Sequence, residues 1–236
     1  MAENDSMTEP STLTWKFWAA TGLVILAILA IFIFLVRGNT SKTTGADQAL
    51  GTQAFDQAKQ RYDKGQFKAA ISLLKTYLSE DRPDAAPAHI LLGSAYEMTG
   101  ASDKALEEYE RAIGLQEDDP SVRYRYGILL RRLGRANKAI VQLSTAVKLD
   151  DQNGLFLSEL AKTYSMQGRY LSAIRNWEKA LKVYNGNAKV QATILLETGD
   201  AYTAIGETAS ARDAYRRGLD LEPDNTYLQS KLKSED

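Results

Sequence analysis

The sequence predicts an all-α fold of stacked helix hairpins, preceded by one membrane-spanning helix. Three observations predict it. The chain has 236 residues, 44% of them hydrophobic and 25% charged, which is typical of a globular domain with an apolar segment attached. Near its start, a stretch of about 20 residues carries no charge and matches the thickness of a bilayer. After that stretch, small and aromatic residues recur with a period of about 34 residues, as in an array of repeated units.

The charge balance and the absence of cysteine exclude several classes of protein. Lys and Arg number 29 against 30 Asp and Glu, which gives a net charge of -1. No overall field therefore attracts the chain to nucleic acid, and we expect no nucleic-acid partner. Without cysteine, the chain has no disulfides, thiolate metal sites or cysteine nucleophile, and its redox compartment cannot be inferred.

Residues 15–37 are predicted to form a transmembrane helix behind a short polar tail at 1–14. The uncharged core at 17–36 is long enough to span the hydrocarbon region at helical rise, and Lys16 and Arg37 close its two ends. A cleaved signal peptide is the alternative. Against it, the apolar core exceeds the usual length and no small-residue cleavage site follows directly. We expect a retained, single-pass membrane anchor.

The side of the membrane on which the repeats lie is predicted only by analogy. Lys16 and the amino terminus stand on one flank, and Arg37 and Lys42 stand on the other, so the charge balance is nearly even. By analogy with single-anchor envelope proteins, we expect a cytoplasmic tail and an extracytoplasmic repeat domain. Residues 38–48 are small and polar and predict a flexible linker, so the repeat domain is expected at 49–236.

Five repeat units follow the linker, each with a small residue, a turn glycine, an alanine and a bulky residue in fixed order. The units lie near 51–84, 86–119, 120–153, 154–187 and 192–225. The shared positions hold Gly93, Gly100, Ala105 and Tyr109; Gly127, Gly134, Ala139 and Leu143; Ala161, Gly168, Ala173 and Trp177; and Gly199, Gly206, Ala211 and Tyr215. The first unit is degenerate. Four extra residues around Lys189 precede the last unit, and we expect them to lengthen one interhelical turn.

This pattern resembles the tetratricopeptide repeat family, whose units carry W-x2-L-G-x2-Y, then A-x3-F, then P. The resemblance covers nearly all of residues 51–225 and implies a right-handed superhelix of antiparallel helix pairs that bury one another's apolar faces. We interpret the small residues as sites of close helix approach and the aromatic residues as core, with polar tips able to reach a partner. Residues 226–233 are expected to form a C-terminal cap helix.

Catalytic and metal-binding patterns are not found in the sequence. The single histidine, His89, falls on the packed face of a first helix, where we expect a hydrogen-bonded core residue. The acidic clusters Glu117-Asp118-Asp119 and Asp150-Asp151 lie in turns, where helix capping is expected, and they lack the spacing of a calcium loop. No phosphate-binding glycine loop or nucleophile elbow is present. We expect no enzymatic activity, no cofactor and no metal.

The family resemblance also implies that the first helices line a concave groove that binds peptides or helices of other proteins. Periodicity gives these candidate partner-binding residues: Phe55, Lys59, Tyr62, Glu97, Tyr124, Arg131, Arg132 and Lys162. The two arginines belong to a basic cluster that could bind a partner's carboxylate. A solvated face balanced by neighbouring acids is the alternative. The lysine and asparagine clamp with which some family members capture chaperone tails is missing.

We therefore expect a membrane-anchored protein-protein interaction scaffold or assembly factor of the cell envelope, acting in translocation, secretion or cytochrome assembly. Its anchor at 17–36 would raise the effective concentration of the groove near the membrane. The alternative is a cytoplasm-facing receptor that delivers preproteins or chaperone clients to a membrane translocase. Regulation of a membrane enzyme and homo-oligomerisation through an exposed end of the array are further hypotheses.

Overall fold

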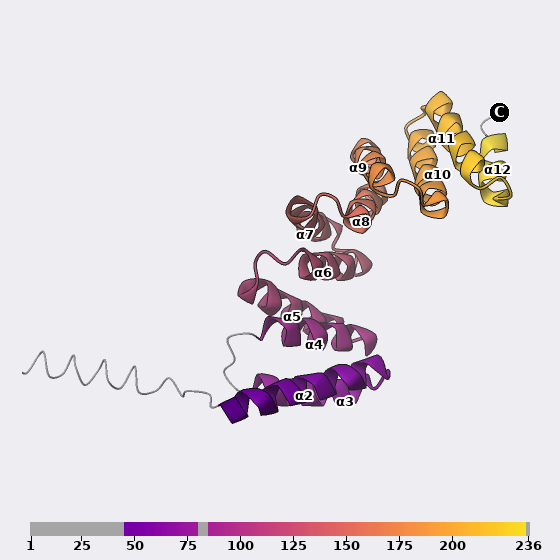
Figure 1. Ribbon diagram of the computed structural model, residues 1–236. Coiled ribbons are helices and arrows are strands. Elements are labelled where there is room, and N and C mark those ends of the chain that lie inside the picture. The colour runs from indigo at the N-terminus through magenta and orange to yellow at the C-terminus, as the bar shows by residue number, and fades with distance from the viewer. Residues whose placement is uncertain (1–44, 80–84, 235–236) are drawn as a thin grey trace, which may run out of the picture. The chain divides into compact units, whose positions relative to one another are not determined.

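The computed structural model describes residues 45–79 and 85–234, with side chains from residue 52 onward. Within these residues the chain is all-α, which confirms the predicted fold class (Figure 1). The helices are α2 (Gly45–Asp63), α3 (Phe67–Leu78), α4 (Ala86–Met98), α5 (Ser102–Leu115), α6 (Pro120–Arg132), α7 (Ala136–Leu149), α8 (Gly154–Met166), α9 (Tyr170–Val183), α10 (Ala188–Ala204), α11 (Thr208–Leu221) and α12 (Thr226–Ser234). Internal contacts divide the chain into two compact units, 1–50 and 51–236, and the second unit holds the repeats.

The helices pair as the repeat predicts. Helix α4 packs against α5, α6 against α7, α8 against α9 and α10 against α11, and each second helix also contacts the first helix of the next pair (Figure 1). The turns inside the pairs share one geometry. Their glycines have φ between 70° and 79°, a left-handed conformation that side chains with a Cβ adopt at a cost. These glycines are Gly65, Gly100, Gly134, Gly168 and Gly206.

Close helix approach explains the regular spacing of small residues along the chain. A Cβ atom on Gly93 would lie 2.9 Å from the ring of Tyr109, and one on Gly127 would lie 2.7 Å from Leu143. The second-helix alanines of the repeat are fully buried. So are Tyr109, Trp177 and Tyr215, which confirms that these aromatic residues form core. A larger residue at either glycine would force the first and second helices of that pair apart.

The prediction for the four extra residues around Lys189 is wrong. The connection from α9 to α10, residues 184–187, is as long as the connection from α7 to α8, residues 150–153. Instead α10 has 17 residues where α8 has 13. Four residues make slightly more than one helical turn, so the added turn continues the helix without rotating its faces far. Asn187 caps the new end, because its side chain accepts a hydrogen bond from the Val190 amide.

Both ends of the array differ from its middle. Helix α2 begins at Gly45, inside the predicted linker, in a segment rich in the helix formers alanine and glutamine. At the other end, α12 packs on α11 and buries Leu228 beside Gly218, as expected of a cap. The predicted transmembrane helix at 15–37 lies outside the described residues. Among the helices of 45–79 and 85–234, none has both the length and the apolar character needed to cross a bilayer.

Candidate partner-binding face

The first helix of each pair, α2, α4, α6, α8 or α10, together with α12, presents side chains that no second helix covers. We call these exposed and half-exposed side chains the first-helix face. All eight predicted partner-binding residues belong to these helices. Lys59 and Arg132 are exposed, and Phe55, Tyr62, Glu97, Tyr124, Arg131 and Lys162 are partly buried. Several of them already have partners inside the chain, and those contacts decide what the face can bind.

The predicted aromatic residues pack against neighbouring helices. The ring of Phe55 lies 5.7 Å from that of Tyr77, and the ring of Tyr62 lies 5.3 Å from that of Phe67, so both contact α3. Tyr124 of α6 lies 5.0 Å from Phe156 of α8. These rings therefore contribute to packing within and between repeats as well as to the face.

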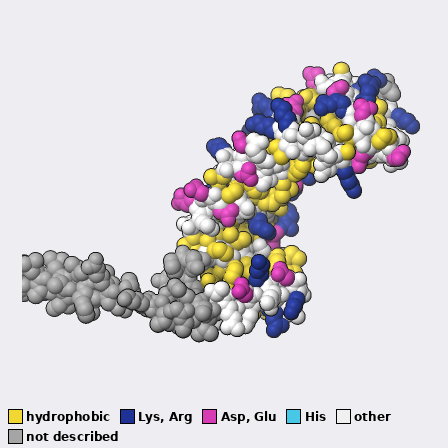
Figure 2. Space-filling model, in the orientation of Figure 1, with side chains coloured by type: hydrophobic (Ala, Val, Ile, Leu, Met, Phe, Trp, Pro, Cys, Tyr) yellow, Lys and Arg dark blue, Asp and Glu magenta, His cyan; other side chains and the backbone are white. Residues whose placement is uncertain are grey.

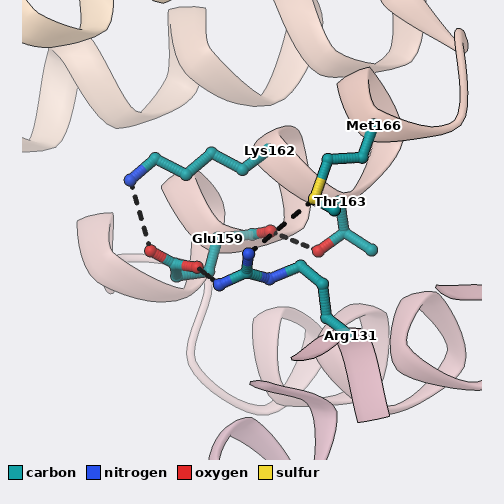
Figure 3. Close-up of polar contacts among 5 residues, drawn as sticks. All are labelled: Arg131, Glu159, Lys162, Thr163 and Met166. Atoms are coloured by element: carbon teal, nitrogen blue, oxygen red, sulfur yellow. Dashed lines mark hydrogen bonds and ion pairs between the residues drawn. The ribbon is translucent and has the colours of Figure 1, made fainter. Parts of the chain in front are cut away.

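Arg131 of α6 reaches across to α8, where its guanidinium lies between Glu159 and Met166 (Figure 3). Its Nη2 donates to Glu159 Oε2 at 2.8 Å, and the side chains of the pair are only 21% and 13% exposed. Glu159 also accepts from Lys162 Nζ at 3.4 Å. Because this ion pair is largely shielded from water, it links two successive first helices more strongly than a surface pair would.

Arg132 is paired as well, with Glu97 of α4. Glu97 accepts a second hydrogen bond, at 2.8 Å, from the hydroxyl of the fully buried Tyr109. The basic cluster of the third repeat is thus balanced at Arg131 and Arg132 by acids of the same chain. In Figure 2, Lys and Arg side chains lie among Asp and Glu side chains over the visible side of the described residues, without a field of one sign. A partner's carboxylate would have to displace one of these internal acids.

A third held carboxylate lies on α10. Asp200 accepts from Tyr215 Oη at 2.7 Å and pairs with Lys231 of α12 at 2.9 Å. Tyr215 repeats the role of Tyr109, since each donates its hydroxyl from the core to a carboxylate of the first-helix face. The expectation that the polar tips of core aromatic residues reach a hydrogen-bond acceptor is confirmed for Tyr109 and Tyr215.

Glu197, also on α10, is the exception. Within the described residues its carboxylate has neither a hydrogen bond nor an ion pair, although it is partly buried. Burial raises the pKa of the Glu197 carboxyl above its ordinary value. Lys162 lowers that pKa, Asp200 and Glu159 raise it, and Lys231 lowers it. Of the carboxylates on α4, α8 and α10, Glu97, Glu159 and Asp200 are held by named donors, and Glu197 is not.

Sequence reasoning missed both Glu159 and Glu197. The eight candidate residues predicted from periodicity include neither of these glutamates. The signal was present in the repeat alignment. The equivalent position of the second to fifth repeats and of the cap is occupied by Leu91, Arg125, Glu159, Glu197 and Lys231.

A cavity of about 920 Å³ was also missed, and it lies away from the first-helix face. Residues of α9, α10 and α11 line it, including Leu181, Leu195, Thr198 and Asp213. Its lining mixes apolar, amide, hydroxyl and charged side chains of both signs. Helix α10, which is longer than the other first helices with described bounds in the middle of the array, forms one wall of this cavity.

The polar residues that we considered for chemistry have structural roles. His89 Nδ1 lies 2.6 Å from Glu108 Oε2, and Arg111 holds the other oxygen of Glu108 at 2.8 Å. The interpretation of His89 as a hydrogen-bonded packing residue is confirmed. Asp119 caps α6 by accepting from the Ser121 amide at 2.7 Å. In the part of the chain that the structure describes, no group of three or more His, Asp or Glu side chains is placed to hold a metal ion.

A sequence profile of the family described as "Cytochrome c-type biogenesis protein H TPR domain" matches residues 39–191, well over half of the chain. The chain belongs to this family. A second tetratricopeptide profile matches residues 158–226. The family match therefore confirms the resemblance to tetratricopeptide repeats, a family of typically non-catalytic scaffolds that mediate contacts between proteins.

Curated relatives share part of their length with the chain. The "TPR repeat-containing protein YpiA" of Bacillus subtilis is 24% identical over 178 residues, 75% of this chain and 39% of the relative. The "Hsp70-Hsp90 organizing protein" of Triticum aestivum is 30% identical over 99 residues, 42% of this chain and 16% of the relative. The chain thus spans well under half the length of these relatives.

Solved structures show the same fold. The crystal structure of MamA has a TM-score of 0.68 and 22% identity and covers 75% of this chain and 94% of its own. YrrB, described as "a TPR protein with an unusual peptide-binding site", has a TM-score of 0.68 and 16% identity and covers 86% of this chain and 97% of its own. At these identities the likeness establishes the fold alone.

Proposed function

We propose that the chain is a membrane-anchored assembly factor that holds a peptide or helical segment of a partner protein on its first-helix face during the making of c-type cytochromes. The observation that carries this proposal is the family match over residues 39–191, whose description names cytochrome c-type biogenesis. The first-helix face supports it, because it combines partly buried aromatic rings with carboxylates and cations.

Anchoring by residues 17–36 and an extracytoplasmic repeat domain complete the proposal. A tether raises the local concentration of the face for partners that emerge at the same membrane. Protease accessibility in sealed vesicles of known orientation, followed with a tag placed after Asp236, tests this part. We expect the tag to be protected from protease on the cytoplasmic side. Digestion there would overturn the extracytoplasmic location and make the cytoplasm-facing receptor the leading hypothesis.

Site-specific crosslinking in intact membranes tests the partner and the face together. A photoreactive residue in place of Thr193, which is exposed on α10, should crosslink to a segment of a c-type cytochrome precursor, identified by mass spectrometry. The matched control places the same photoreactive residue at Lys179, exposed on the second helix α9. Crosslinks to such a precursor from position 179 and none from position 193 would overturn the assigned face. No such precursor at either position would overturn the pathway.

Delivery of chaperone clients is the second hypothesis, favoured by the likeness to the wheat Hsp70-Hsp90 organizing protein. The charge on the first-helix face disfavours the version of this hypothesis in which the repeats bind the C-terminal carboxylate of a chaperone. Glu197 on α10 has no internal cation partner among the described residues, and its negative charge would repel an incoming carboxylate. Self-association of the array is a separate proposal, testable by sedimentation of the full chain in detergent.

A further inference from the structure

Glu159 and Glu197 can be compared directly because they occupy the same position in successive repeats. Each stands on the first helix of its pair, and their separation along the chain is the repeat length plus the four-residue insertion. Both side chains are partly buried. Glu159 is bonded to Arg131 of the preceding first helix α6, and Glu197 is close enough to Lys162 and Glu159 of the preceding first helix α8 for their charges to act on it. Their surroundings should therefore match unless a neighbouring residue differs.

The neighbour does differ. Glu159 receives Arg131 from the preceding first helix at 2.8 Å. The residue of α8 equivalent to Arg131 is Ser165, one repeat length further along the chain. A serine side chain is too short to span the junction as the arginine does, and Glu197 has no ion pair or hydrogen bond among the described residues.

The nearest cations are engaged elsewhere. Lys162 Nζ pairs with Glu159 at 3.4 Å, and Lys231 Nζ pairs with Asp200 at 2.9 Å. Glu159 and Asp200 add two further negative charges that face Glu197. A carboxylate that has lost part of its hydration and lacks a donor gains most from a charged donor, because charge-assisted hydrogen bonds are about twice as strong as neutral ones.

We propose that Glu197 binds a lysine or arginine side chain of the partner segment that lies on the first-helix face. The partner's cation takes the place that Arg131 fills at the preceding junction. This inference rests on the proposed function and adds the chemistry of the partner. The bound segment has a basic residue that lies beside Glu197 when the segment crosses from α8 to α10. Because Glu97, Glu159 and Asp200 are paired internally, Glu197 is the carboxylate of α4, α8 and α10 that remains to bind the partner's cation.

A random 12-residue peptide library selected on the full-length chain in lipid nanodiscs tests the inference. The wild-type chain should enrich peptides with lysine or arginine at one fixed place relative to their apolar residues. Two variants should abolish that enrichment for different reasons. Glu197→Gln removes the charge with little change of shape, and Ser165→Arg supplies an internal cation that occupies the site. Glu107→Gln, an exposed carboxamide exchange on the second helix α5, is the matched control and should select the same peptides as wild type.

Binding of one selected basic peptide, measured by calorimetry, gives the magnitude. We expect about tenfold weaker binding for Glu197→Gln and for Ser165→Arg, and unchanged binding for Glu107→Gln. Circular dichroism confirms that each variant is folded. If peptides are selected without lysine or arginine enrichment, or if enrichment survives in both variants, the inference is wrong while peptide binding stands. If the wild-type chain selects no peptide, the proposed peptide-binding function fails and the inference fails with it.

Discussion

Two junctions between successive first helices have a glutamate at the equivalent position, but only one of these glutamates has a cation partner within the described residues. Between α6 and α8, Arg131 crosses the gap to Glu159 (Figure 3). Between α8 and α10, Ser165 stands where the arginine would be, and Glu197 has no donor in the described residues. The first junction satisfies its charge internally. The second leaves a half-buried charge unpaired, which is destabilising in the free chain and favourable for binding a cation.

The comparison shows how an array of near-identical units can divide tasks among its junctions. Each unit keeps a buried alanine and a buried bulky residue at the same two positions, so this shared packing does not distinguish one junction from the next. One position differs between the two junctions: it holds Arg131 in one repeat and Ser165 in the next. This difference decides whether the glutamate at the junction is paired within the chain or remains able to bind a partner's cation. Substitutions that exchange the two junctions test this division.

Converting the first junction into the second should cost the most. Arg131→Ser leaves Glu159 with Lys162 alone, and we expect the free energy of unfolding in urea to fall by about 2 kcal/mol, because a largely buried carboxylate loses its closer cation. Arg131→Ser combined with Glu159→Gln should recover at least half of that loss, because the largely buried charge is then gone. Equal instability of the single and double variants would contradict the assignment of the cost to charge.

Removing the hydroxyl that holds a neighbouring carboxylate should have a smaller effect. Tyr215→Phe deletes the 2.7 Å hydrogen bond to Asp200, which keeps its pair with Lys231. We expect a loss of about 1.5 kcal/mol in the same unfolding measurement, typical of a buried hydrogen bond to a charged group. Tyr227→Phe on α12, where the ring is exposed, is the control and should change stability little. A larger loss for Tyr227 than for Tyr215 would refute the role given to the hydroxyl.

Converting the second junction into the first should stabilise the free chain. Ser165→Arg supplies Glu197 with the cation that Arg131 gives Glu159, and we expect a gain of about 1 kcal/mol in the free energy of unfolding. Ser165→Ala changes the same position without adding charge and should show no comparable gain. If the arginine variant is no more stable than the alanine variant, the two junctions are not equivalent.

The smallest effect concerns pH. Burial raises the pKa of Glu197, so over the interval between its unfolded and folded values the folded chain binds more protons than the unfolded chain. The contribution of Glu197 to the free energy of unfolding must therefore fall as pH rises through that interval. Glu197→Gln lacks this fall and should be slightly more stable than wild type at neutral pH, with equal stability in acid. A series of urea melts from acid to neutral pH, with Glu107→Gln as control, measures the difference.

The sequence predicts the repeats well because their determinants are local. The turn glycine and the pair formed by Gly93 and Tyr109 recur at fixed spacing, so helix pairs and core follow from one alignment. The site is harder to predict, because it depends on contacts between side chains of different repeats. The pairing of Arg131 with Glu159 and the lack of such a pair at Glu197 are visible only when equivalent positions of successive units are compared. The extra length of α10 was not predicted for another reason: four added residues can extend a helix by about one turn as readily as they can lengthen a loop.

The hydroxyls of Tyr109 and Tyr215 have a further consequence for experiment. Each phenol is enclosed between the helices of its pair, yet its oxygen donates to a carboxylate on the surface that partners are proposed to use. The near-ultraviolet absorption of tyrosine responds to the hydrogen bond that its oxygen makes. A bound segment that draws Glu97 or Asp200 towards itself would therefore alter the absorbance of residues that it never touches. The array contains its own optical reporters of occupancy, and no dye needs to be attached.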